Sequence, residues 1–189
     1  MAIKTIAEFK SQLAGGGARP NLFEVTLATL PNAAVASGWN ADKFSYMCKA
    51  AALPASNIAS IDVPFRGRIF KVAGDRTYDT WTVTVINDED FVLRNAFEIW
   101  MDGISRGENA LGATLPSSYM IDAQVKQYGR GSSPSSTNSA GTDPSVLKTY
   151  EFQSIFPINI SAIDLSYDSS DTIEEFTVEF AVQSWRVVS

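Results

Sequence analysis

The stretch from Leu53 to Asp90 constrains the fold most, because it joins a strand that must be half-buried to a segment that cannot be. Across residues 80–86, tryptophan and valine alternate with threonine, the period-two pattern of a strand with one face in a core. In the preceding residues, Pro54 and Pro64 each remove a hydrogen-bond donor that a central strand would need. We therefore expect a core strand and, before it, a long extended arm outside the central sheet.

The arm carries side chains that suit an external partner. On an extended chain, Arg66 and Arg68 fall on one face with Phe70 beside them, and Phe65 and Ile69 fall on the other. Three interpretations stay open: an edge hairpin with solvated arginines, an arm that docks on another subunit, or a nucleic-acid contact. In the docking interpretation the arginines meet carboxylates, and the candidate contact residues are Leu53, Pro54, Pro64, Phe65, Arg66, Arg68 and Phe70.

The arm is followed by a predicted turn and a predicted helix. Gly74 and Asp75 favour a turn just before the core strand. Asn87 and Asp88 can cap a helix that runs to Ser105, with acidic residues at its positive end. The apolar stripe of this helix, which we expect to pack on the sheet, comprises Leu93, Ala96, Phe97, Trp100, Met101 and Ile104.

The remaining elements are mostly short strands. A capping box formed by Thr5 and Glu8 predicts a short helix that ends at Gly15, with Ile6, Phe9 and Leu13 on one face. Alternating residues predict strands at 21–27, 44–49, 121–128, 148–155, 161–167 and 174–182, with a turn at 168–171.

The last predicted strand has two different faces. Phe176, Val178 and Phe180 pack a core, and Glu175 and Glu179 lie on the opposite face. That face is either simply solvated or, if strands of several subunits close into a barrel, part of the wall of a lumen. Glu175 and Glu179 are then candidates for lumen charge, and Asp164 is a further candidate by the same argument.

Several kinds of chemistry are absent from the sequence. The chain of 189 residues has no histidine, which removes Ser-His-Asp and Cys-His catalysis and histidine-containing zinc sites. Cys48 is the one cysteine, so it forms no disulfide within the chain and no thiolate metal cage. A glycosidase-like carboxylate pair needs no sequence signature and stays open. We expect no enzyme activity, no metal and no cofactor.

Length and hydropathy indicate one domain, residues 1–189, with enough chain for a core. No apolar run approaches the roughly 18 residues that span a bilayer, and no secretory signal is visible. The net charge of −6 makes the protein a poor static binder of DNA or anionic membranes.

Five blocks of sequence, in order along the chain, resemble the tail-tube proteins of contractile-tailed bacteriophages (myoviruses). Any single block is weak, but five in the right order are specific. The blocks are ARPNLFEV (18–25), CKAAALPA (48–55), VAGDRTYDTWTVTVINDE (72–89), YEFQSIFP (150–157) and TIEEFTVEF (172–180). The Ser/Gly-rich insert at 129–145 departs from the resemblance, because it is longer than the hairpin tip expected there.

The resemblance implies a mainly β fold: a two-sheet antiparallel β-sandwich or partial barrel with one flanking α-helix and a long extended assembly arm. It also implies hexameric rings that stack into a hollow conduit inside a contractile sheath, with the arm reaching the neighbouring ring and subunit. The expected partners are further copies of the chain, the sheath protein, and the baseplate and tail-terminator proteins. Tape-measure protein and genomic DNA would pass through the lumen without sequence-specific binding, and an acidic wall would keep DNA from adhering. The expected location is the virion tail, assembled in the cytoplasm of the bacterial host.

Two other functions remain open from the sequence. One is the inner tube of a related injection machine, either type VI secretion or a tailocin, with protein as cargo. The other is a virion carbohydrate-binding β-sandwich, which requires an exposed aromatic platform. Its candidates, Trp39, Trp81, Trp100 and Trp185, lie mostly in core-like patterns.

Overall fold

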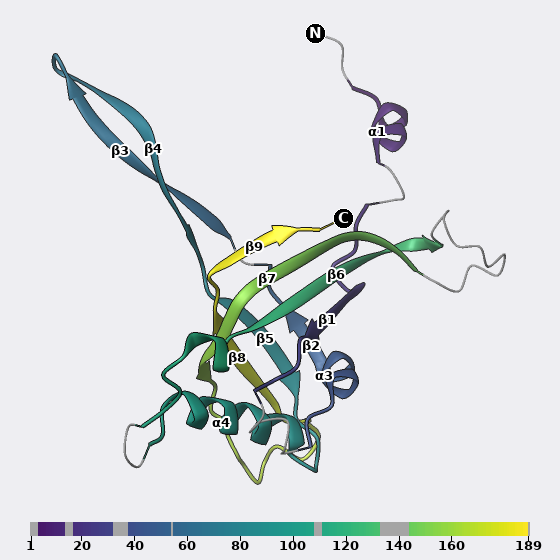
Figure 1. The fold of residues 1–189 in the computed structure, drawn as a ribbon. Helices are drawn as coiled ribbons and strands as arrows, with labels where there is room; N and C mark the ends of the chain where they lie inside the picture. Colours follow the sequence, from purple (N-terminus) through teal and green to yellow (C-terminus); the bar gives the residue numbers. More distant parts are fainter. Residues whose placement is uncertain are drawn as a thin grey trace.

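The chain forms one seven-stranded antiparallel sheet, from which a separate two-stranded hairpin extends (Figure 1). The computed structural model describes residues 4–13, 17–31, 38–53, 55–107, 111–132 and 144–188. The strand order is β1-β6-β7-β8-β5-β2, and β9 pairs with β7. The strands are β1 (Phe23–Leu27), β2 (Cys48–Ala51), β3 (Ser56–Phe65), β4 (Arg68–Tyr78), β5 (Trp81–Ile86), β6 (Ile121–Ser132), β7 (Pro144–Ile160), β8 (Glu175–Ala181) and β9 (Ser184–Val187). The helices are α1 (Ile6–Gln12), α3 (Ala41–Met47), α4 (Val92–Ile104) and the 3-10 turn η2 (Pro116–Ser118).

A bend in β7 divides the sheet into two facing halves. Before the bend β7 pairs with β6 and β9, and after it β7 pairs with β8. Ser154 lies at the bend with φ +54°, and its N–H donates to the Asp122 carboxylate at 2.9 Å. The register between β6 and β7 shifts beside it, as at a β-bulge. The predicted two-sheet, partly closed β architecture is therefore confirmed, with one strand shared by both halves.

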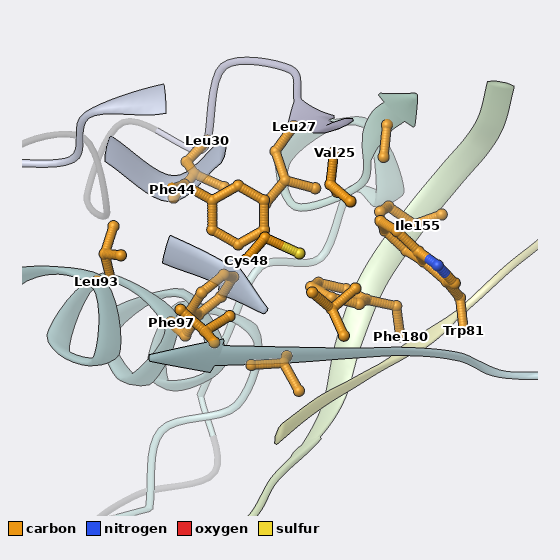
Figure 2. Close-up of a cluster of buried hydrophobic side chains, with 14 of the residues drawn as sticks. Val25, Leu27, Leu30, Phe44, Cys48, Trp81, Leu93, Phe97, Ile155 and Phe180 are labelled. Carbon is orange, nitrogen blue, oxygen red and sulfur yellow. The ribbon is translucent and has the colours of Figure 1, made fainter. Parts of the chain in front are cut away.

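The two halves and α4 enclose an aromatic core (Figure 2). The indole of Trp81 on β5 stacks on Phe152 of β7, with ring centroids 4.6 Å apart. Both side chains are fully buried, so this contact joins the halves across the fold. Phe180 of β8 lies 5.3 Å from Trp81 and 6.0 Å from Phe97 of α4.

Helix α4 packs on this core through the predicted stripe, since Leu93, Ala96, Phe97 and Trp100 are all buried. Its predicted start was wrong. The helix begins at Val92, after Phe91 in a left-handed conformation, so Asn87 and Asp88 do not cap it. None of the described helices is long and apolar enough to cross a membrane.

Three further local predictions were also wrong. Residues 44–47 belong to helix α3, because the Asn40 side chain caps it by accepting the Lys43 N–H at 3.0 Å. Gly74 and Asp75 lie within β4 instead of forming a turn. Residues 161–166 form no strand. The predictions for the N-terminal helix and for the strands at 21–27, 80–86, 121–128, 148–155 and 174–182 were confirmed to within a few residues.

Candidate assembly surfaces

The predicted arm is the hairpin of β3 and β4, which stands clear of the main sheet (Figure 1). Its tip is the turn Arg66–Gly67, where both residues have positive φ, at +46° and +78°. Such a two-residue turn matches the twist of an antiparallel ribbon. Ten residues of β3 at about 3.3 Å each give the arm a length of about 30 Å. Leu53 at its base is exposed, and Pro54 lies outside the described residues.

The register of the hairpin corrects the faces expected for an extended chain. Phe65 pairs with Arg68, Val63 with Phe70 and Ile61 with Val72. Directly paired residues share a face of a ribbon, so Phe65 lies with Arg68 and Phe70, not with Ile69. The turn at Arg66 and Gly67 resets the alternation, which is why the extended-chain prediction failed.

One face of the arm is therefore apolar, and most of it is open to solvent. The exposed fractions of its side chains range from 42% for Val72 to 67% for Phe70. The opposite face is mixed, and the Lys71 ammonium lies 3.2 Å from the Asp62 carboxylate there. We call the first surface the arm apolar face; it consists of Ile61, Val63, Phe65, Phe70 and Val72.

The arginines of the arm tip have no carboxylate partner among the described residues. The Arg66 guanidinium lies over the Phe65 ring, 5.3 Å from its centroid, and neither Arg66 nor Arg68 forms a salt bridge within the described part of the chain. An exposed apolar surface with unpaired cations at its end is typical of a docking surface. The predicted contact of these arginines with another subunit's carboxylates remains a prediction.

The second candidate surface is the outer face of β8 and β5. Glu175 and Glu179 alternate with the buried Phe176, Val178 and Phe180, as predicted. Thr82 and Thr84 of β5 lie opposite Glu179 and Thr177, and the two threonine hydroxyls at 84 and 177 are 3.4 Å apart. The result is a polar sheet face opposite the core.

The charge of this face is partly neutralised. The Lys49 ammonium on β2 binds the Glu175 carboxylate, whereas Glu179 forms no salt bridge among the described residues. Asp164 does not share the face through a strand, because the strand that its prediction required is not formed. The position of all three carboxylates relative to a lumen stays a prediction.

The Lys43 ammonium binds two carboxylates in the segment just before α4. The Lys43 ammonium lies 3.0 Å from the Asp88 carboxylate and also binds Asp90. Hydrogen bonding to Lys43, and to the Val92 N–H, lowers the pKa of Asp90, and the same carboxylates raise the pKa of Lys43. Asp88 and Asp90 therefore link the segment before α4 to α3.

No group of three or more potential metal ligands occurs among the described residues. Burial raises the pKa of the Cys48 thiol to about 12, so the thiol is protonated at neutral pH and is a poor nucleophile.

Comparison with known proteins assigns the chain to a family. Residues 18–188 match the phage tail tube protein family. The chain belongs to this family. It is 36% identical over 172 residues to tail tube protein gp19 of Enterobacteria phage T4, and the match covers 91% of this chain and 93% of that protein. It is 24% identical over 180 residues to the tail tube protein of Serratia phage KSP90, covering 93% and 92%.

Members of this family are structural, and this chain is accordingly a structural subunit of a tail inner tube and a component of the virion tail. Solved structures share the fold. One is the tube-terminating cap of the anti-feeding prophage, with a TM-score of 0.60 at 16% identity, covering 100% of this chain and 95% of that one. Another is the extended sheath–tube complex of the PVC extracellular contractile injection system, with a TM-score of 0.51 at 14% identity, covering 99% of each chain.

Sequence reasoning missed two exposed apolar features. The loop 161–174 was predicted to contain a strand, yet Leu165 and Tyr167 are exposed. The signal against the strand was local: the segment runs directly into Asp168, Ser169 and Ser170, which favour turns. Helix α1 was predicted correctly, but the pattern did not reveal that it has no buried residue.

Proposed function

We propose that this chain, folded as a single domain, forms hexameric rings that stack into the hollow inner tube of a contractile tail, inside the sheath. The observation that carries the proposal is the exposed apolar face of the arm, in a chain that belongs to the phage tail tube protein family. A monomer gains nothing from about 30 Å of solvent-exposed apolar ribbon, whereas a second copy can bury it.

Ring closure would use the ends of the sheet. Among the described residues, β1 and β2 are the two ends of the hydrogen-bonded path. Unpaired strand edges promote association, and pairing them between neighbours removes them, as closure of a barrel does within one chain. A heterologous contact repeated around a ring closes it, and a second heterologous contact stacks the rings.

The polar face of β8 and β5 is the proposed lumen wall. Glu179 contributes charge there without a paired cation among the described residues, and Glu175 contributes less because Lys49 binds it. Asp164 is a weaker candidate since it lies on a loop. Genomic DNA and the tape-measure protein would then pass a wall that repels phosphate and binds no base sequence. Because the relatives at 36% identity are phage tail tubes, we favour DNA over protein as the cargo.

The tryptophans do not form the exposed aromatic platform that the carbohydrate-binding alternative requires. Trp81 and Trp100 are buried in the core, and Trp39 and Trp185 pack against it. The rings of the partly buried Trp39 and Trp185 each contact two other aromatic rings, so the four indoles form no exposed platform together.

The test is electron microscopy of the purified protein over a concentration series, alone and with isolated baseplates as nuclei. We expect hollow rods whose end-on averages have six-fold symmetry. A matched variant removes the arm by joining Ile58 to Arg76, which face each other in the hairpin, through an Asn-Gly turn. This variant should keep the unfolding transition of the parent and form no rods. A parent protein that stays monomeric even on baseplates would overturn the proposal.

A further inference from the structure

Residues 161–174, which we call the acidic loop, form a second exposed surface that combines apolar and charged groups. The loop contains four carboxylates and no lysine or arginine. Leu165, Tyr167 and Ile173 are exposed to 81%, 107% and 73%. Exposed large apolar side chains that are surrounded by charges of one sign are expected at a protein interface, not on the surface of a free monomer.

The acidic loop is anchored at both ends, so it is a presented surface and not a frayed strand. At its start, Ser161 exchanges two hydrogen bonds with Thr177 of β8: the Ser161 N–H donates to the Thr177 carbonyl at 2.8 Å, and the Ser161 hydroxyl accepts the Thr177 N–H at 2.9 Å. At its end, the Asn87 N–H donates to the Glu174 carbonyl at 2.9 Å, and the Asn87 amide donates to the Glu174 carboxylate at 3.0 Å. Ile163 packs against the core between these anchors.

The arm tip has the opposite charge and the same apolar character. Residues 66–71 contain Arg66, Arg68 and Lys71 and no acid. Phe65 and Phe70 beside them are 65% and 67% exposed. Since Arg66 and Arg68 have no carboxylate partner within the described chain, their charges are available to a partner that carries one. The carboxylates of the acidic loop supply the matching charge.

The two surfaces lie at opposite ends of the subunit. Figure 1 shows the arm leaving the body at the upper left, and the acidic loop, in yellow-green, at the bottom beside α4. An arm cannot reach the acidic loop of its own chain in this arrangement. In a stack of identically oriented subunits whose axis runs from the acidic loop to the arm, however, the arm end of one ring faces the loop end of the next.

We propose that the acidic loop is the acceptor surface for the arm tip of a second copy in the adjacent ring. The inference rests on the proposed function and adds to it the surface that receives the arm. Arg66 and Arg68 then pair with carboxylates such as Asp168 and Asp171, and Phe65 packs near Tyr167.

Charge exchange tests the pairing. Arg66→Glu with Arg68→Glu, and separately Asp168→Lys with Asp171→Lys, should each raise the critical concentration for rod formation about tenfold or more, because like charges then face each other. Combining all four substitutions should return it to within about threefold of the parent. The control Asp42→Lys with Asp102→Lys makes the same change in net charge as the loop variant but on other elements, and it should leave assembly unchanged. Circular dichroism of each monomer checks folding.

The outcomes separate this inference from the proposed function. If the arm variant fails to assemble while the loop variant behaves as the parent, the arm docks elsewhere, and only this inference is overturned. If the variant with all four substitutions does not recover the critical concentration of the parent, this inference alone is likewise overturned. If the parent forms no tube, the proposed function fails first.

Cross-linking gives a readout that does not depend on assembly defects. Rods grown from a mixture of Arg66→Cys and Tyr167→Cys chains should form disulfide-linked dimers on oxidation. Cys48 should not take part, because it is buried. Mixtures of Arg66→Cys with Asp102→Cys should not. Dimers in the second mixture but not the first would overturn the proposal.

Discussion

Phe70 and Ile69 offer a direct test of the arm apolar face, because they are neighbours with nearly equal exposure on opposite faces. Phe70 is 67% exposed and Ile69 is 65% exposed, but the register places only Phe70 on the apolar face. A phenylalanine has about 200 Å² of surface to bury, so about 130 Å² remains available. At about 25 cal/mol per Å², docking would gain about 3 kcal/mol at most.

That free energy corresponds to about two orders of magnitude in an association constant. We expect Phe70→Ser to raise the critical concentration for rod formation by about 10- to 100-fold, since docking buries only part of the ring. Ile69→Ser should change it by less than about threefold. Pelleting over a concentration series measures both values. The unfolding transition of both monomers should match that of the parent, because neither side chain reaches the core.

Equal effects of the two substitutions would refute the assignment of faces, whichever direction they took. A harmless Phe70→Ser with a harmful Ile69→Ser would show that the mixed face of the hairpin is the one that docks.

Three further predictions concern the folded monomer. Cys48 should react with a thiol reagent at pH 8 only after unfolding, because burial raises its pKa to about 12; fast labelling of the native protein would contradict this. Lys43→Met should raise the pKa of Asp90 toward its ordinary value, as measured by NMR titration. Because Lys43 lowers that pKa, the contribution of the pair to stability is present above about pH 4 and is lost as the pH falls through the folded pKa. Trp81→Ala removes the ring that stacks on Phe152 and should lower the free energy of unfolding by about 3–5 kcal/mol, as measured in urea; a loss below about 1 kcal/mol would mean that the halves are not joined there.

Sequence patterns predicted the elements whose burial follows a simple period. Strands β5 and β8 and helix α4 each bury one regular face, so alternation or a helical stripe marks them. Helix α1 was predicted from its capping box and from the spacing of Ile6, Phe9 and Leu13. It forms without buried residues, because Thr5 and Glu8 satisfy the first turn without tertiary contacts.

The failures arose where local chemistry overrides the period. Asn40 caps α3 and converts an apparent strand into a helix. The turn at Arg66 and Gly67 inverts the faces of the arm, because two residues with positive φ reset the alternation. The apparent strand at 161–167 pairs with no strand among the described residues, so Leu165 and Tyr167 face solvent, while Ile163 packs against the core. The candidate arm was thus located from sequence, whereas its apolar face and its proposed acceptor required the register and the topology.

The separation of the basic arm from the acidic loop makes each free subunit an electric dipole. A subunit that approaches the end of a growing tube is turned by the field before any contact forms, so productive collisions become more frequent. Salt screens this orientation over about 10 Å at 0.1 M. If the arm docks on the acidic loop as proposed, the tube has a direction, with cationic arms at one end and anionic loops at the other. On that proposal, we expect the protein that starts the tube and the protein that caps it to carry opposite charges on their contact surfaces.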